Sequence, residues 1–277
     1  MNILVTGCNG QLGSEMQLLE KENPQHKYFN TDVAELDITD QDAIERFVAD
    51  NDIDGIVNCA AYTAVDKAEE DCEKAHAINV VGPRNLAIAS KGVGSKLVHI
   101  STDYVFGGGL STDKIYVEDD TKSPETVYGI TKYEGEKEIT GNTSNYYIFR
   151  TAWLYGDGPN FVRTMLKLGR EKDEVKVVYD QYGSPTYTED LADIIYQAVQ
   201  KQIPVGIYHA TNLGFTSWYD FTKEIYAKAG LTCNVLPVTS EEFVRPAKRP
   251  KNSMMAKGKL LDEGIEIPSW QDALERY

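Results

Sequence analysis

Short apolar runs alternate along the first 150 residues with segments in which apolar residues recur every three or four positions. The runs predict strands close to the start of the chain and at residues 27–31, 55–59, 96–100 and 146–150. Helical spacing follows at residues 11–22, around Ile44, Phe47 and Val48, and at about residues 69–90. Strands that are regularly followed by helices predict a parallel sheet covered on both faces, which is a doubly wound α/β fold.

Polar residues mark the starts of two predicted helices. We expect Thr39 and Asp42 to form a capping pair before the helix of Ile44, and Ser217 to cap a helix that continues through Lys228.

The pattern after residue 150 is more mixed. It predicts a helix whose apolar face carries Phe161, Met165 and Leu168, and further elements at residues 175–178, 188–201 and 206–210. We expect residues 1–150 to form the core unit, with seven strands or a similar number in its sheet. Residues 151–277 are expected to form mainly a smaller substrate-binding lobe, with some segments returning to the core.

Composition narrows the class of protein. The chain has 277 residues, of which 42% are hydrophobic, and a net charge of −15. Such a charge disfavours nucleic-acid binding, which needs a broad cationic face. No apolar run is long enough for a membrane span and no targeting segment is visible. The four cysteines lie far apart without metal-ligand spacing, so we expect a protein of the reducing cytoplasm.

Three glycines follow the first predicted strand at regular spacing. Gly7 and Gly10 allow a sharp turn close to a pyrophosphate, and Gly13 allows the next helix to pack on the sheet. The helix N-terminus then offers free N–H groups to the anion. This G-x-x-G-x-x-G spacing predicts a dinucleotide loop, and the alternative is an ordinary glycine-rich turn.

A carboxylate follows the second strand. Asp32 lies where it can accept hydrogen bonds from an adenosine ribose, although Glu35 and Asp37 compete for this role. No basic residue lies between positions 32 and 41, which favours NADH over NADPH. The third strand ends in residues 60–63, which are mostly small and let a flat cofactor lie across the strand ends.

Polar residues with catalytic potential follow the fourth strand. Thr102 lies at the strand end, and Tyr128 and Lys132 share one face of a later helix because they are four positions apart. An ammonium beside a tyrosine lowers the pKa of the phenol, which suits acid–base chemistry at neutral pH. The same spacing also arises by chance on exposed helices.

Together these residues resemble the extended short-chain dehydrogenase/reductase family. Further blocks at residues 58–69, 101–106 and 180–186 resemble its reductases of nucleotide-linked 4-keto-6-deoxy sugars. The resemblance implies a Rossmann-type fold and reduction of a C4 ketone by NADH or NADPH, with Thr102, Tyr128 and Lys132 as the catalytic set. The implied cofactor residues are Gly7, Asn9, Gly10, Gln11, Leu12, Gly13, Asp32, Asp37, Ile38, Ala60, Ala61, Tyr62, Thr63, Ile100, Tyr128 and Lys132. The implied substrate residues are Thr102, Asp103, Tyr104, Val105, Trp153 and Arg249.

Two other functions remain open at this point. Sugar-nucleotide epimerases and dehydratases share the loop and the tyrosine, but dehydratases commonly follow Thr-Asp with Glu, where this chain has Tyr104. Proteins similar to the reductases also serve as non-catalytic regulatory subunits. Some members are magnesium-dependent dimers, so possible Mg²⁺ use and a monomeric or homodimeric state stay open, and no metal-ligand cluster stands out.

A basic stretch lies near the C-terminus. Between Phe243 and Leu261 there are six Lys or Arg residues and no acid. This local positive charge favours contact with a substrate diphosphate by Arg249 or Lys251, and the alternative is a solvated basic turn.

Overall fold

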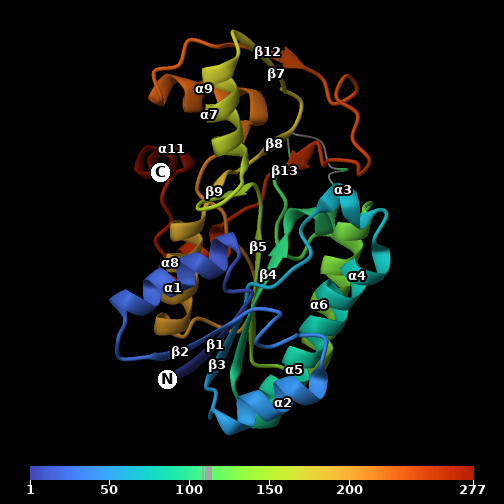
Figure 1. Ribbon diagram of the computed structural model, residues 1–277, viewed down its shortest axis with the longest axis vertical. Coiled ribbons are helices and arrows are strands. Elements are labelled where there is room, and N and C mark those ends of the chain that lie inside the picture. The colour runs from blue at the N-terminus through green and yellow to red at the C-terminus, as the bar shows by residue number, and fades with distance from the viewer. Residues whose placement is uncertain (108, 110–113) are drawn as a thin grey trace.

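A six-stranded parallel sheet forms the centre of the computed structural model, which describes residues 1–107, 109 and 114–277 (Figure 1). The strands are ordered β10-β5-β4-β3-β1-β2 and all neighbours run parallel. They are β1 (Asn2–Thr6), β2 (Lys27–Thr31), β3 (Gly55–Asn58), β4 (Lys96–Thr102), β5 (Tyr146–Thr151) and β10 (Gly206–His209). The sheet therefore has six strands, close to the seven or similar number expected. Its order reverses between β1 and β3, where ligands of such sheets bind at the carboxyl ends of the strands.

Helices cover both faces of this sheet, which confirms the doubly wound Rossmann-type fold. One apolar core joins Val5, Val57 and Val98 of the strands to α1 (Gln11–Glu22), α8 (Thr188–Lys201) and α10 (Gly258–Asp262). The core on the opposite face contains the strand residues whose side chains point the other way. They pack against α2 (Gln41–Asp50), α5 (Gly82–Val93) and α6 (Val127–Asn142). Neighbouring positions of one strand thus enter opposite cores, as burial on both faces requires.

The predicted helix over residues 69–90 is interrupted. The structure has α3 (Val65–Ala68), α4 (Cys72–His76) and a π-helical turn (Ala77–Val81) before α5. In this turn the Asn79 amide bonds both the N–H and the C=O of Tyr62, at 2.9 and 3.1 Å. The cap of α2 also differs from the prediction. Asp40, not Thr39, accepts the N–H of Ala43 at 2.9 Å, because the Thr39 hydroxyl is bonded to Asp37.

A smaller layer lies beyond the carboxyl ends of the main strands, at the top of Figure 1. There α7 (Phe161–Glu171) and α9 (Trp218–Lys228) pack on a two-stranded parallel sheet of β7 (Glu174–Val178) and β12 (Asn234–Val238). Ser217 caps α9 as predicted, accepting the N–H of Asp220 at 3.0 Å. Short pairings complete the layer, with strands β6 (Leu154–Tyr155), β8 (Tyr182–Gly183), β9 (Thr186–Tyr187), β11 (Thr216–Ser217) and β13 (Asn252–Ser253).

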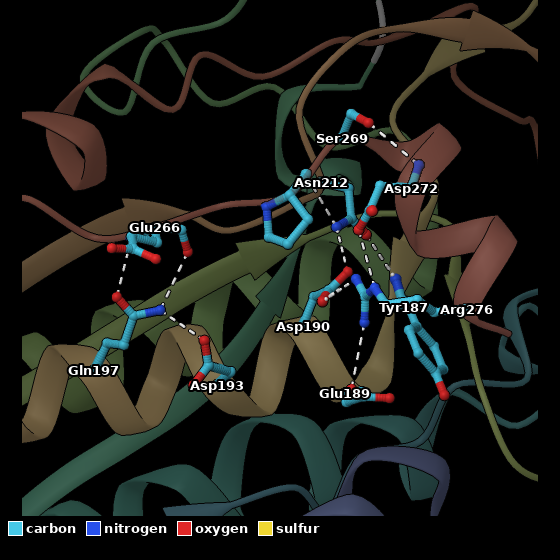
Figure 2. A network of polar contacts seen from close by, with 11 residues as sticks. Tyr187, Glu189, Asp190, Asp193, Gln197, Asn212, Glu266, Ser269, Asp272 and Arg276 are labelled. Atoms are coloured by element: carbon cyan, nitrogen blue, oxygen red, sulfur yellow. Dashed lines mark hydrogen bonds and ion pairs between the residues drawn. The ribbon is translucent and has the colours of Figure 1, made fainter.

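The last helix, α11 (Trp270–Arg276), is fastened to α8 by a polar network (Figure 2). Arg276 donates to Asp190 at 2.6 Å and to Asp272 at 2.9 Å. The Asn212 amide donates to the other oxygen of Asp190 at 2.6 Å. This network joins segments of the chain that are far apart in the sequence. No helix in the described part of the chain is both long and apolar enough to cross a membrane.

Candidate active site

The loop between β1 and α1 leaves no room for side chains at two of its glycines. Gly7 has a φ of +65°, and a Cβ atom there would lie 2.6 Å from the backbone nitrogen of Ala60. A Cβ atom on Gly13 would lie 2.2 Å from the carbonyl oxygen of Gly7. Both clashes are with backbone atoms, which cannot move aside as a flexible side chain can. The loop is thus packed tightly between α1 and the end of β3.

The N-terminus of α1 faces a cavity of about 760 Å³ lined in part by Gly10, Gln11 and Leu12. Gly10 is the N-cap residue, and no side chain of the described residues caps this helix. The Gln11 side-chain oxygen is buried without a hydrogen-bond partner among the described residues. The free N–H groups fit the oxygens of a bound pyrophosphate, whereas the Gln11 oxygen, which can only accept, is open to a hydroxyl donor of the same ligand, so this structure is suited to the expected dinucleotide.

Replacing Gly13 by alanine is expected to weaken cofactor binding and to destabilise the protein by about 1–3 kcal/mol, because the added methyl group overlaps backbone. The matched control is Gly141→Ala on α6, where a Cβ atom would meet nothing within 4 Å. Fluorescence titration with NADH and NADPH, together with thermal unfolding, measures both effects. Equal behaviour of the two variants would contradict the tight packing of this loop.

The acidic residues expected at the cofactor ribose lie outside the lining of the cavity. The Asp32 carboxylate accepts the N–H groups of Asn9, at 3.1 Å, and Val33, at 2.8 Å, so it ties the end of β2 to the glycine loop. Asp37 is exposed and accepts from Thr39. Ile38 is buried in the core below α5. Asp37 and Ile38 thus have local structural contacts in the ligand-free chain.

The end of β3 contributes alternate residues to the cavity. Ala61 and Thr63 line it, whereas Ala60 and Tyr62 do not. Tyr62 instead packs in a small apolar cluster with Ala68 and Ala75, against which the Tyr128 ring also lies. Alternate residues of this segment therefore border the cavity beside the glycine loop.

Thr102, Tyr128 and Lys132 all line the same cavity, together with Ile100. The Thr102 hydroxyl donates to Asp103 at 2.9 Å and is hydrogen-bonded to Tyr128. The Lys132 Nζ donates to the carbonyl oxygen of Ile100 at 2.6 Å. The end of β4 and one face of α6 thus bring together the three residues that the sequence grouped.

The electrostatics of Tyr128 differ from the expectation. Burial raises its pKa to about 12, opposed by the hydrogen bond with Thr102 and assisted by the charge of Asp103. Lys132 does not lower this pKa in the ligand-free chain, because its own pKa is about 8 and it is an uncharged amine at the pH where the phenol ionises. Tyr128 is consequently a protonated phenol at neutral pH, which is the form that can donate a proton.

Asp103 and Tyr104 line the cavity beside this set. Burial raises the pKa of Asp103 to about 6, although hydrogen bonds from Ser253 and Thr102 favour its charged form. The Tyr104 ring packs edge to face on Tyr128, with ring centroids 5.3 Å apart. Val105, expected to contact substrate, is instead fully buried in an apolar cluster. The turn after Asp103 directs its side chain inward and away from the cavity.

Trp153 forms an aromatic wall of the cavity with Trp218. The two rings are stacked, with centroids 3.6 Å apart and planes at 14°. Trp153 has a φ of +51°, an uncommon conformation for a non-glycine residue. Such strain persists only where surrounding packing holds it, and here the ring also covers Gly183, where a Cβ atom would lie 2.8 Å away.

Three cations of the basic stretch differ in their ion pairing. Arg249 lines the cavity and pairs with Asp66 at 2.7 Å, whereas Lys251 pairs with Asp180 at 3.4 Å. Burial alone would raise the pKa of Asp66. The hydrogen bond from the backbone N–H of Ala247, together with the hydrogen bond and charge of Arg249, outweighs burial and holds the pKa of Asp66 below its ordinary value. Arg245, which sequence reasoning did not single out, is exposed at the cavity and makes no ion pair with any described residue. Its place in the same basic run was the available signal.

Comparison with known proteins identifies the family. The family model described as the RmlD substrate binding domain matches residues 1–277, the whole chain. The chain belongs to this RmlD family.

Relatives of this RmlD chain agree in sequence and in fold. A dTDP-4-dehydrorhamnose reductase of Streptomyces griseus is 43% identical, with 98% of this chain and 91% of that protein covered. A crystal structure of a dTDP-4-dehydrorhamnose reductase from Clostridium acetobutylicum has a TM-score of 0.96 at 46% identity, covering 100% and 98% of the two chains. That from Bacillus anthracis, solved in complex with NADP, has a TM-score of 0.94 at 43% identity, covering 100% and 98%.

Among the described residues no group of three or more His, Cys, Asp or Glu side chains is placed to hold a metal ion. The residues that line the cavity supply hydroxyl, amine, carboxylate, guanidinium and aromatic groups.

Proposed function

We propose that this chain reduces the C4 ketone of dTDP-4-dehydro-L-rhamnose to dTDP-L-rhamnose, in nucleotide-sugar biosynthesis. One observation carries the proposal: a single cavity joins the N-terminus of α1 to Thr102, Tyr128 and Lys132. A dinucleotide that lies across the strand ends can thus reach a proton donor and the substrate ketone together. The names of the relatives support the same reaction for members of this family.

The residues of the cavity fit distinct parts in this reaction. The bound cofactor supplies the hydride to C4, and Tyr128 donates its proton to the developing alkoxide oxygen. The Thr102 hydroxyl orients the carbonyl by a hydrogen bond. Lys132 holds the nicotinamide ribose. Because burial keeps the phenol of Tyr128 protonated, the free site is already prepared for reduction.

The cofactor is a reduced nicotinamide dinucleotide, held chiefly by the glycine loop and by the cavity residues of β3 and β4. Asp32 lies near the loop and carries a negative charge, which favours NADH, whereas the Bacillus anthracis relative was solved with NADP. We therefore propose that either cofactor is accepted. Residues 1–150 hold the cofactor in this proposal.

The substrate lies mainly against residues 151–277. Trp153 covers the sugar, and Asp103 and Tyr104 contact its hydroxyl groups. The diphosphate lies toward Arg249 and toward Arg245, which pairs with no acid among the described residues. The proposal also includes a cytoplasmic location, favoured by four unpaired cysteines, and a monomer or homodimer.

The test uses the purified chain with dTDP-4-keto-6-deoxyglucose, with and without the 3,5-epimerase that produces dTDP-4-dehydro-L-rhamnose. We expect NADH or NADPH to be oxidised in proportion to the product, dTDP-L-rhamnose, only when the epimerase is present. Sugar conversion without net cofactor oxidation would instead identify an epimerase or a dehydratase. Tight cofactor binding without turnover would identify a binding subunit.

A further inference from the structure

A buried row of polar side chains lies beneath the cavity and ends on Lys132. It runs from Thr6 on β1 through Asn58 on β3 and His99 on β4 to Lys132 on α6, and each of these residues is at most 2% exposed. The contacts are 2.8 Å from Thr6 to Asn58, 3.0 Å from Asn58 to His99 and 3.3 Å from His99 to Lys132. The row therefore connects the strands beneath the cofactor loop to a residue of the catalytic set.

The orientation of the Asn58 amide is fixed by a backbone group. The N–H of Ala60, which can only donate, points to one side-chain atom of Asn58 at 3.1 Å. That atom must be the oxygen Oδ1, which also accepts the Thr6 hydroxyl. The Asn58 NH₂ group is consequently the part that faces Nδ1 of His99.

The amide in turn fixes the tautomer of His99. Because the Asn58 NH₂ donates, Nδ1 must carry a lone pair rather than a proton. Burial, followed by the charge of Lys132, lowers the pKa of His99 well below its ordinary value, so the ring is neutral. A neutral imidazole with a bare Nδ1 carries its proton on Nε2, the atom that faces Lys132.

The position of Lys132 is complementary to this tautomer only when the lysine is uncharged. An amine can accept the Nε2–H of His99 and still donate to the Ile100 carbonyl oxygen at 2.6 Å, whereas an ammonium has no lone pair to accept with. We propose that His99 is a positioning residue that acts through Lys132: its fixed tautomer favours the uncharged amine against β4 and leaves the ammonium to turn toward the cavity.

Other charged and titratable groups near Lys132 set the range over which it changes charge. Burial lowers the pKa of Lys132 to about 8, opposed by the negative charge of Glu136. Glu136 lies one turn further along α6 and is itself paired with Arg150 of β5. Tyr128 lies one turn before, and Asp103 follows β4. Lys132 is thus an ammonium below a pH of about 8 and an amine above it.

The functional meaning of this arrangement rests on the proposed contact between Lys132 and the cofactor ribose. Oxygen atoms of a bound ligand accept hydrogen bonds from an ammonium and favour that form, whereas His99 favours the amine. Binding in the cavity should therefore be accompanied by proton uptake at mildly alkaline pH.

The first test observes the His99 ring in the wild-type chain. The chain has four histidines, so nitrogen NMR of histidine-labelled protein resolves each ring, and His99 is assigned by the signal lost in His99→Gln. Between about pH 6 and pH 9 we expect a neutral ring that carries its proton on Nε2. A ring protonated at Nδ1, or at both nitrogens, would overturn the proposal.

The second test measures the pKa of Lys132 from its Nζ signal in lysine-labelled protein without cofactor. Glutamine at position 99 can accept from Asn58 and donate to Lys132, so we expect His99→Gln to retain the lowered pKa. His99→Phe lacks the N–H and should raise the Lys132 pKa by about one unit, the effect of one hydrogen bond. The same pKa in wild type and His99→Phe, or an equal rise in both variants, would contradict this role. Neither measurement depends on turnover, so failure here is distinct from failure of the proposed reaction.

Discussion

Tyr128→Phe is expected to lower kcat by about 10²- to 10⁴-fold, the range typical of a lost general acid. The phenol hydroxyl is hydrogen-bonded to Thr102 in the cavity, and burial holds its pKa near 12, so it carries a proton at neutral pH. The phenylalanine ring preserves the edge-to-face packing on Tyr104. Cofactor affinity and thermal stability should consequently change little while the chemical step slows.

The matched control is Tyr133→Phe, which removes the same hydroxyl from the same helix. Tyr133 packs against the apolar cluster of Phe106 and Met255, and it does not line the cavity. Steady-state kinetics with dTDP-4-dehydro-L-rhamnose and cofactor titrations distinguish the variants. Near-normal kcat in Tyr128→Phe would refute its assignment as proton donor.

Glu136→Gln is expected to lower the free energy of unfolding by about 3–5 kcal/mol, because it leaves the guanidinium of Arg150 buried without its negative partner. Both side chains are buried, at 0% and 2% exposure. Arg150 donates two parallel hydrogen bonds to the carboxylate, at 2.8 and 2.7 Å, and Ser101 donates a third. The pair joins α6 to β5 of the central sheet.

Two comparisons isolate the effect of burial. Asp157→Asn breaks an exposed pair with Arg163 of similar length, 2.6 Å, and should cost at most about 1 kcal/mol. The double variant Glu136→Leu with Arg150→Met removes both charges and should recover much of the loss, because no unpaired charge remains. Denaturant unfolding measures each variant, and equal losses for the buried and exposed pairs would contradict the argument.

Local patterns in the sequence were sufficient for the elements that position the site. The glycine spacing located the turn before α1. The strand end at Thr102 and the i, i+4 pair of Tyr128 and Lys132 could also be predicted, because each is determined by residues close together in the sequence. Their presence in one cavity follows from the parallel sheet, whose carboxyl ends meet at one edge.

Contacts between distant residues could not be predicted in this way. Nothing near Arg249 in the sequence indicates its ion pair with Asp66, which lies 183 positions earlier. The row that fixes His99 likewise depends on β1, β3 and β4 lying side by side. The burial of the Val105 and Ile38 side chains in apolar cores could not be predicted either, because sequence position near a site does not give side-chain direction.

The attachment of α11 to α8 has a consequence for the order of events during protein synthesis. Asp190 finds its arginine partner 86 residues later in the chain, and Asn212 lies between them in the sequence. While the ribosome is still producing the intervening segment, α8 can form and cover its face of the sheet, but its buried carboxylate lacks a cation. The newly made chain can therefore reach its final stability only after Arg276 has left the exit tunnel.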